Sequence, residues 1–286
     1  MQNTTPSAGP EGRPISATLT SKRRITPAKS PEDVMQLKFV TDDASFDVRL
    51  GQCIRIRAPG QFGQRYHERL YQIADLDRSD PQRTEFELLV RRWNYIDEFN
   101  GERYAGVASN FLCDLATGGT IEFTGPVGHP FDAPATGDEN LLMIGMGTGI
   151  APFRGLIRRI YETAGKWRGQ VRLFYGARSG LEMLYMNDQN ADIANYYDEA
   201  TFKAFKAVSP RPAFEAPPAI EQAIAAHATE VWNLLSDPKT HLFIAGPKAL
   251  LDRVEAALTE VAGSPAAWQE QRAQLVASGR WHEMLY

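Results

Sequence analysis

Residues 141–160, with the sequence LLMIGMGTGIAPFRGLIRRI, constrain the fold more than any other stretch of the chain. Four apolar residues fit a buried strand, glycine then takes alternate positions (Gly145, Gly147, Gly149), and Pro152 opens an amphipathic helical pattern. Glycines let backbone N–H groups approach a phosphate closely, and the following helix N-terminus adds roughly half a positive charge. This order of strand, glycine loop and helix predicts a dinucleotide site, with a plain tight turn as the alternative.

Length and composition narrow the class of protein. The chain has 286 residues, enough for about two domains, and its net charge of −4 argues against a general nucleic-acid binder. Cys53 and Cys113 lie far apart and are interpreted as buried free thiols, and we expect no metal site. No apolar run approaches the ~20 residues of a membrane span, and the N-terminus lacks the apolar core of a secretory signal. The expected compartment is the cytoplasm, with the end of an organelle transit peptide as the alternative for the first residues.

Residues 15–134 show short strands separated by turns, after a disordered arm expected at residues 1–14. Several strands alternate apolar with polar residues, which suits an antiparallel sheet with one face in water. A barrel or a sandwich follows, and we predict an antiparallel β-barrel domain. Ser109 is expected to N-cap a helix over residues 110–115. The strands are expected at residues 16–24, 34–40, 53–57, 70–74, 85–91 and 120–123.

A linker at residues 132–139 separates this domain from a second pattern, in which strands and helices alternate. The alternation predicts an α/β doubly wound nucleotide-binding domain over residues 135–286. The ligand of such a sheet lies at the carboxyl ends of the strands, where Gly176 and Gly246 fall. Strands are expected at 141–144, 171–175, 205–208 and 241–245, and helices at 153–164, from 181, at 219–235 and at 250–261.

Three motifs make the glycine loop more specific than it is alone. GVASNFLCDL at residues 106–115, TGPVG at 124–128 and GMGTGIAPFR at 145–154 occur in this order along the chain. Together they resemble the plant-type ferredoxin–NADP(+) reductase family, whose members are FAD-dependent and place an FAD-binding β-barrel before a nicotinamide-nucleotide domain. The resemblance covers residues 17–286. It implies hydride exchange between NADPH and FAD, coupled to one-electron transfer with a ferredoxin or a flavodoxin.

The resemblance also implies FAD contacts in the barrel domain. Arg69-Leu70-Tyr71-Gln72 resembles the family's R-x-Y-S motif, so Tyr71 is expected to stack on the isoalloxazine and Arg69 to pair with the FAD pyrophosphate. Tyr95 falls on the position that stacks on adenine. The expected positions on the FAD and nicotinamide side are Arg69, Leu70, Tyr71, Gln72, Val90, Arg91, Tyr95, Gly106, Val107, Ala108, Ser109, Thr148, Gly149 and Tyr286.

The choice between NADPH and NADH depends on the ends of two strands. The strand at 171–175 ends in Gly176-Ala177-Arg178, without the acidic residue that binds a bare ribose 2′-OH, so Arg178 could meet a 2′-phosphate. Ser209 resembles the family's phosphate-binding serine, but the family's Lys and Tyr fall on Pro217 and Ala219. We expect NADPH as the nucleotide. The alternative is that each arginine is a solvated surface charge that contacts no phosphate. The expected NADP positions are Gly147, Pro152, Arg178, Ser209, Arg211 and Gly246.

Three departures from the family surround the expected reacting centre. Gln72, Ala245 and Met284 stand where the family has Ser, Cys and Glu. Tyr286 resembles the family's last aromatic residue, which stacks on the flavin opposite Tyr71 and must move aside for the nicotinamide. The expected catalytic residues are therefore Tyr71, Gln72 and Tyr286. The departures indicate a tuned rate or an unusual electron acceptor.

Two other functions are compatible with the same residues. One is an NADH-dependent reductase component of an oxygenase or other redox system. The other is a structural FAD-containing subunit of a larger redox complex. An acidic electron carrier would need a basic rim near the flavin, which is expected from Lys22, Arg23, Arg24 and Arg65 unless these are plain solvated charges.

Overall fold

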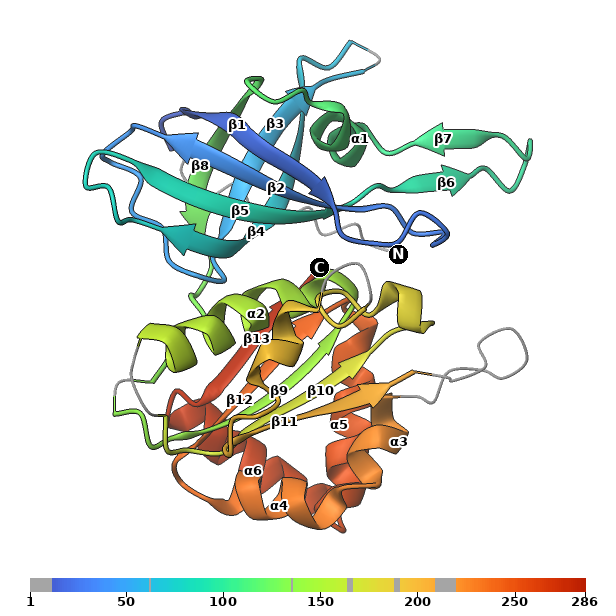
Figure 1. Ribbon diagram of the computed structural model, residues 1–286. Coiled ribbons are helices and arrows are strands. Elements are labelled where there is room, and N and C mark those ends of the chain that lie inside the picture. Colours follow the sequence, from blue (N-terminus) through green and yellow to red (C-terminus); the bar gives the residue numbers. More distant parts are fainter. Residues whose placement is uncertain (1–11, 62, 135, 164–166, 188–190, 209–219) are drawn as a thin grey trace.

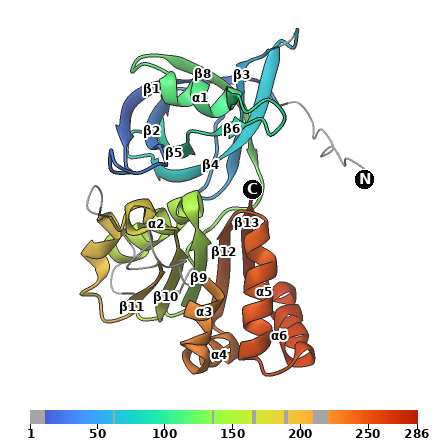
Figure 2. The same ribbon diagram turned by 90° about the vertical axis from the view of Figure 1, so that its right-hand side faces the viewer.

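The computed structural model describes residues 12–61, 63–134, 136–163, 167–187, 191–208 and 220–286. It consists of a β-barrel, formed by the first half of the chain, and an α/β domain below it (Figures 1 and 2). The arm expected at residues 1–14 lies almost wholly outside the described residues. Within the described ranges, we find no helix that combines the length and the apolar character needed to cross a membrane.

Six strands close into a barrel in the order β1-β2-β5-β4-β3-β8, and every neighbouring pair is antiparallel. The predicted β-barrel is thus confirmed. Alternate apolar side chains point inward, and the stacked rings of Phe39 and Phe86, with centroids 5.6 Å apart, lie in the core. The strands are β1 (Ile15–Arg24), β2 (Val34–Thr41), β3 (Cys53–Pro59), β4 (Tyr66–Asp77), β5 (Thr84–Arg91) and β8 (Thr120–Val127).

Between β5 and β8 the chain leaves the barrel as a hairpin and returns through a helix. β6 (Asn94–Ile96) pairs with β7 (Arg103–Ala105), and the hairpin projects away from the barrel (Figure 1). Neither strand was expected from the sequence, because three residues are too short to show a period of two. α1 (Val107–Asp114) then packs on one end of the barrel, against β3 and β4.

Five parallel strands form the sheet of the second domain, in the order β11-β10-β9-β12-β13. β9 comes first in the sequence and lies in the middle, so the chain winds outward in both directions. The predicted doubly wound α/β domain is therefore confirmed. A ligand crevice forms beyond the carboxyl ends of the strands where such winding reverses. The strands are β9 (Asn140–Met146), β10 (Val171–Gly176), β11 (Phe202–Ala207), β12 (Thr240–Gly246) and β13 (Trp281–Leu285).

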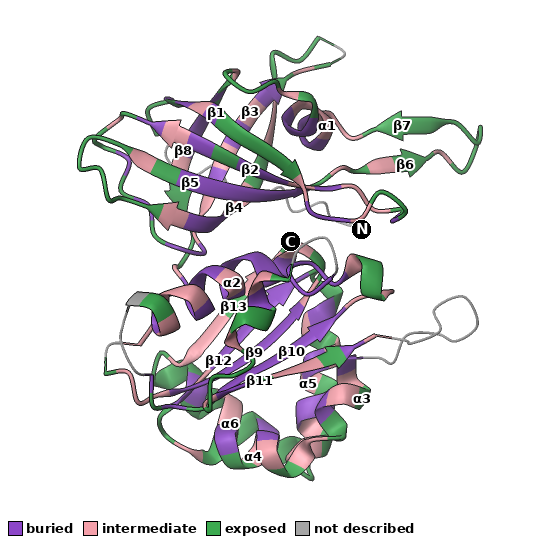
Figure 3. Ribbon diagram, in the orientation of Figure 1, coloured by how far each residue is buried: buried purple, intermediate pink, exposed green. Residues whose placement is uncertain are grey.

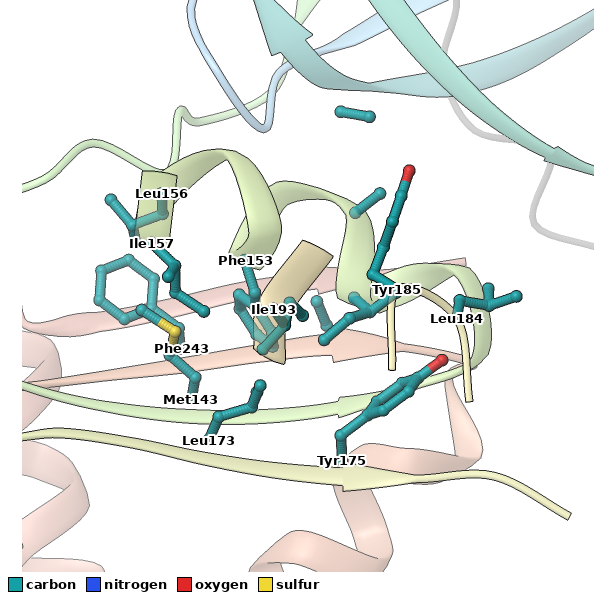
Figure 4. Packing of buried hydrophobic residues seen from close by; sticks show 14 of the residues in the cluster. Met143, Phe153, Leu156, Ile157, Leu173, Tyr175, Leu184, Tyr185, Ile193 and Phe243 are labelled. Atoms are coloured by element: carbon teal, nitrogen blue, oxygen red, sulfur yellow. The ribbon is translucent and has the colours of Figure 1, made fainter. Parts of the chain in front are cut away.

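Helices cover both faces of this sheet (Figure 2). α2 (Ile150–Arg158) lies between the sheet and the barrel, and Figure 4 shows Phe153, Leu156 and Ile157 of this helix near Met143 and Leu173 of the strands. The opposite face is buried by apolar side chains of the remaining helices, and the strands β9, β10 and β12 are buried almost throughout (Figure 3). These helices are α3 (Ile220–Ala225), α4 (Ala228–Ser236), α5 (Ala249–Val261) and α6 (Pro265–Ala277).

Several elements of the α/β domain differ from the sequence-based expectation. The helix expected at 219–235 is divided into α3 and α4, because His227 leaves the helical conformation and precedes α4 as its N-cap. In place of a helix from 181, the described residues form two short 3-10 turns, Gly180–Glu182 and Asp192–Tyr196. α6 and β13 were not expected. α6 buries only Trp268 and Leu275, which is too few apolar positions for a clear helical period.

The two domains are joined by apolar and charged contacts. A Cβ atom at Gly155 of α2 would lie 2.7 Å from the carbonyl oxygen of Ala74, so the helix and β4 approach each other closely. Next to this contact, Arg154 of α2 pairs with Asp75 of β4 at 3.3 Å and with Glu87 of β5 at 3.2 Å. The helix that follows the glycine turn is thereby held against the barrel.

Candidate functional site

The first half of β4 has an edge without a neighbouring strand among the described residues. β3 pairs with β4 from Tyr66 to Gln72, whereas β5 pairs with β4 only from Ile73 onward. β4 therefore has an open edge along residues 66–72. Backbone N–H and C=O groups along such an edge can hydrogen-bond a planar polar ring in the place of a strand.

This open segment of β4 carries the expected flavin contacts. Arg69 and Tyr71 lie on one face of the strand and Leu70 and Gln72 on the other, because side chains alternate along a strand. Tyr71 is half-buried against the barrel core, and burial raises the pKa of its phenol, which stays neutral. Arg69 and Leu70 are exposed. The segment therefore offers a positive charge for a pyrophosphate and an aromatic plane for a flavin.

The N-terminus of α1 lies at the same end of the barrel. The expectation that Ser109 N-caps a helix over 110–115 is wrong, because α1 begins at Val107 and Gly106 is its N-cap. Ser109 is buried in the first turn, where its Oγ accepts a hydrogen bond from the backbone N–H of Trp93 at 3.1 Å. Its hydroxyl thus ties the hairpin to the helix. The first amides of a helix have no partners within it, so this turn still suits a pyrophosphate.

The β6–β7 hairpin presents aromatic rings beside α1. Tyr95 stacks on Tyr104 with ring centroids 5.4 Å apart, and about half of the Tyr95 surface (49%) is exposed. Such a ring is a platform on which an adenine can stack. Arg91, at the end of β5, lies over the ring of Trp93 at 4.7 Å. The side chain of Val90 is buried in the barrel core, so only its backbone can contact a cofactor.

The glycine loop is shorter than the sequence predicts. β9 continues to Met146, and residues 147–149 form a 3-10 turn that leads directly into α2. Gly147 has a φ of +57°, in the left-handed region that favours glycine, and its carbonyl accepts a hydrogen bond from the hydroxyl of Tyr175 at 2.9 Å. A Cβ atom at Gly149 would lie 2.1 Å from the carbonyl oxygen of Ala245. The turn is thus fixed between β10 and β12 with the N-terminus of α2 behind it, an arrangement that suits a phosphate.

Tyr286 lies beside this turn. Its hydroxyl accepts a hydrogen bond from Oγ1 of Thr148 at 2.8 Å. Its backbone is tied to the end of β12, where its N–H donates to the carbonyl of Gly246 at 3.1 Å. The side chain itself is 55% exposed. The ring can therefore change its position without opening the apolar core.

The three departures from the family lie together where the two domains meet. Gln72 stands opposite Cys53 in the β4–β3 register, and Met284 stands opposite Ala245 in the β13–β12 register. Sγ of Cys53 lies 3.8 Å from Sδ of Met284, so the two pairs are in contact. Burial raises the pKa of the Cys53 thiol to about 11, and it stays protonated at neutral pH. We call Gln72, Cys53, Ala245 and Met284 the neutral cluster.

Sequence reasoning did not place Cys53 in the site. Both cysteines are free, but only Cys113 is fully buried, and the expectation of two buried thiols is wrong for Cys53, which is half-buried. The register of β3 against β4 reveals its position, and a single sequence does not show that register.

Glu283, the neighbour of Met284, does not take the place of the family's glutamate. Its carboxylate instead accepts a hydrogen bond from Nε1 of Trp281 at 3.0 Å. A shift of one residue along a strand moves the side chain to the opposite face.

Only one of the three residues expected to contact a 2′-phosphate lies among the described residues. Arg178 follows β10 at the carboxyl end of the sheet, where it was expected, and its side chain is 65% exposed. Its Nε donates to Glu182 at 3.2 Å, and its guanidinium also pairs with Glu32 of the barrel domain. Ser209 and Arg211 lie outside the described residues, as do the departures at 217 and 219.

The basic residues expected to form a rim are mostly engaged within the molecule. Lys22 donates to two carbonyl groups at the end of α1, Arg23 donates to a glutamine on β2, and Arg24 donates to the β1–β2 loop. The guanidinium of Arg65 lies 5.0 Å from the ring of Tyr66 on an exposed turn.

The residues present fit FAD and a dinucleotide. The barrel offers an open strand edge, a half-buried ring, a helix N-terminus and an exposed stacking platform. The α/β domain offers a glycine turn at the reversal of its sheet. The neutral cluster joins the two halves. Among the described residues, His, Cys, Asp and Glu side chains form no group that could hold a metal ion.

Comparison with known proteins agrees with both domains. Residues 16–131 match the family model of the oxidoreductase FAD-binding domain, and residues 143–256 match that of the oxidoreductase NAD-binding domain. Among solved structures, the ferredoxin–NADP+ reductase of Plasmodium falciparum with 2′P-AMP has a TM-score of 0.72 at 20% identity, with 96% of each chain covered. At that identity the likeness shows the fold alone.

Curated relatives are closer in sequence. The ferredoxin–NADP reductase of Synechocystis sp. is 32% identical over 246 residues, which cover 82% of this chain and 59% of the relative. The ferredoxin–NADP reductase of Spirulina sp. is 30% identical, with 87% of each chain covered, and the cyanelle enzyme of Cyanophora paradoxa is 30% identical, with 92% of this chain and 74% of the relative covered. The chain spans about three fifths of the length of its Synechocystis and Thermosynechococcus vestitus relatives.

Proposed function

Because the chain belongs to the ferredoxin–NADP reductase family, we propose that it is an FAD-dependent oxidoreductase that exchanges electrons between NADP(H) and a ferredoxin. Bound FAD supplies chemistry that side chains lack, since it takes up a hydride as an electron pair and releases electrons singly. The protein contributes binding, orientation and the exclusion of water.

One observation carries the proposal. The contact between Cys53 of the barrel and Met284 of the α/β domain brings the open edge of β4 next to the glycine turn. Hydride transfer requires two reactants to be held side by side, and here each domain brings one binding element to the same junction. A chain that used the two domains for separate binding events would not need this contact.

The proposed roles follow from the positions of the side chains. Arg69 and the first turn of α1 hold the pyrophosphate of FAD, Tyr71 covers one face of the flavin, and Tyr95 supports the adenine. Tyr286 covers the other face and turns aside when a nicotinamide enters. Hydride transfer needs no acid or base, so it is compatible with the neutral cluster, whose side chains carry no charge.

The nucleotide and the partner are further parts of this proposal. NADPH is favoured by Arg178 at the end of β10, together with Ser209 and Arg211, which lie outside the described residues. Membership of the family favours ferredoxin as the electron-transfer partner, and flavodoxin is a second one-electron carrier. We further propose domain boundaries at 15–134 and 135–286 and a location in the cytoplasm.

Turnover with defined acceptors tests this function. The FAD-loaded chain is supplied with NADPH and either a plant-type ferredoxin or ferricyanide, and the reduction of each acceptor is followed. We expect reduction of both. Reduction of ferricyanide alone would point to a reductase component with another acceptor, and reduction of neither would overturn the proposal in favour of a structural FAD-containing subunit.

A further inference from the structure

We propose that Glu32 is a specificity-determining residue that lowers the preference for a 2′-phosphorylated nucleotide, by holding its carboxylate on the guanidinium of Arg178. This inference rests on the proposed function, because it concerns the adenosine end of the nucleotide. It adds a residue from the barrel domain to a site that is otherwise built on the α/β domain.

The contacts of Glu32 cross the boundary between the domains. One carboxylate oxygen, Oε1, pairs with Nη2 of Arg178. The other, Oε2, lies 3.6 Å from Nη1 of Arg91, which is one of the expected positions on the FAD and nicotinamide side. Arg178 has Glu182 as a second partner at 3.2 Å. Two arginines therefore face two carboxylates, and the group carries no net charge.

Glu32 is held in this position by its own loop, which connects β1 to β2 on the side of the barrel facing the α/β domain (Figure 1). Arg24 donates to the carbonyl groups of Ser30 and Glu32 at 3.2 and 3.1 Å, and the N–H of Glu32 donates to Oγ of Ser30 at 3.2 Å. The carbonyl of Ile25 accepts a hydrogen bond from Asn187 of the α/β domain at 3.3 Å. Only 20% of the Glu32 side chain is exposed, so the carboxylate is fixed on the arginine.

The chemistry of the two ligands explains the effect. A 2′-phosphate must either displace the carboxylate from Arg178 or lie beside it, and both cost binding free energy, the second through repulsion of like charges. A ribose 2′-OH can instead donate a hydrogen bond to the same carboxylate. β10 ends without the acidic residue that commonly takes this bond, and Glu32 supplies one from the other domain.

Two nucleotides that differ only in the 2′-phosphate test this role without requiring turnover. The affinities of 2′,5′-ADP and 5′-AMP are measured by calorimetry on the FAD-loaded protein, its Glu32→Gln variant and a Glu122→Gln control. Glu122 is exposed on β8 of the same barrel, so the control makes the same change in net charge.

We expect Glu32→Gln to tighten 2′,5′-ADP binding by about threefold to tenfold, the range of one partly exposed ion pair, and to leave 5′-AMP unchanged or slightly weaker. The gain should disappear in the Arg178→Ala background. An unchanged ratio of the two affinities, or the same change in Glu122→Gln, would overturn the role of Glu32 while leaving the proposed function intact. Failure of the parent protein to bind either nucleotide would instead overturn both.

Discussion

Replacement of Arg154 by methionine should weaken the contact between the two domains and lower the free energy of unfolding. Arg154 is the first charged residue of α2, and its side chain is only 12% exposed. It pairs with Asp75 and Glu87 of the barrel, whose side chains are 3% and 8% exposed, and with Asp192 at 2.7 Å. Its guanidinium also lies 4.8 Å from the ring of Tyr185. The change removes one positive charge and leaves buried carboxylates behind.

The expected loss in the free energy of unfolding is about 3 kcal/mol. Breaking a buried ion pair by removing one partner costs about 3–5 kcal/mol, because the other charge stays buried. The lower end applies here, since Arg158 still lies 2.8 Å from Asp75 and Lys38 still lies 3.3 Å from Glu87. With an m-value of about 3 kcal/mol per molar urea for a chain of this size, the midpoint should fall by about 1 M.

Urea unfolding followed by tryptophan fluorescence measures this loss, and Arg49→Met is the matched control. Arg49 also pairs with a carboxylate, that of Asp132 at 2.9 Å, but both side chains are exposed, so its removal should cost less than about 1 kcal/mol. Equal losses in the two variants would show that the burial of the Arg154 ion pairs does not stabilise the protein more than an exposed pair does.

The pH dependence provides a second check on Arg154→Met. Burial raises the pKa of Asp75, while Arg158 and Arg154 act in the opposite direction, so removal of Arg154 should raise it further. A carboxyl group with a raised pKa in the folded state contributes stability at low pH that is lost as the pH rises through that pKa. The deficit of Arg154→Met should therefore shrink as the pH falls from about 8 toward the ordinary carboxyl pKa of about 4, and a deficit that grows on acidification would contradict this sign.

Two further predictions concern the reacting centre, and a third concerns the 2′-phosphate site. Tyr286→Ser should admit the nicotinamide more readily and narrow the preference for NADPH over NADH, and an unchanged ratio of kcat/KM values would reject a gating role. The rate of flavin reduction at saturating NADPH should be flat between about pH 6 and 9, because the Cys53 thiol has a pKa of about 11, whereas Met284→Glu should introduce a titration that stopped-flow profiles detect. Arg211→Ala should weaken NADPH binding by ~1–3 kcal/mol more than NADH binding, and equal losses in titrations with the two nucleotides would exclude a phosphate contact.

Much of the architecture could be predicted because it depends on local patterns. The alternation of polar and apolar residues in QCIRIR predicted β3, because it has the period of a strand with one face in water. The apolar run before Gly145 predicted β9, because a buried strand is apolar on both faces. Tyr71 and Gln72 were assigned from the family motif, and both lie on the open segment of β4. Their roles at the flavin stay predictions.

The remaining features depend on contacts between distant segments. Cys53 reaches the site through the β3–β4 register, and Glu32 reaches Arg178 through the packing of one domain on the other. Neither contact leaves a periodic signal in a single sequence. Ser109 was assigned to an N-cap because its residue type favours that position. In the structure its Oγ accepts a hydrogen bond from the backbone N–H of Trp93, and the helix begins at Val107.

The most direct test of the central claim is an anaerobic titration of the FAD-loaded protein with NADPH and, separately, with NADH, in which the loss of oxidised-flavin absorption and its rate are recorded. We expect rapid bleaching by NADPH, because the open edge of β4 and the glycine turn are held together at the junction of the domains. A protein that binds FAD but is bleached by neither nucleotide would contradict it.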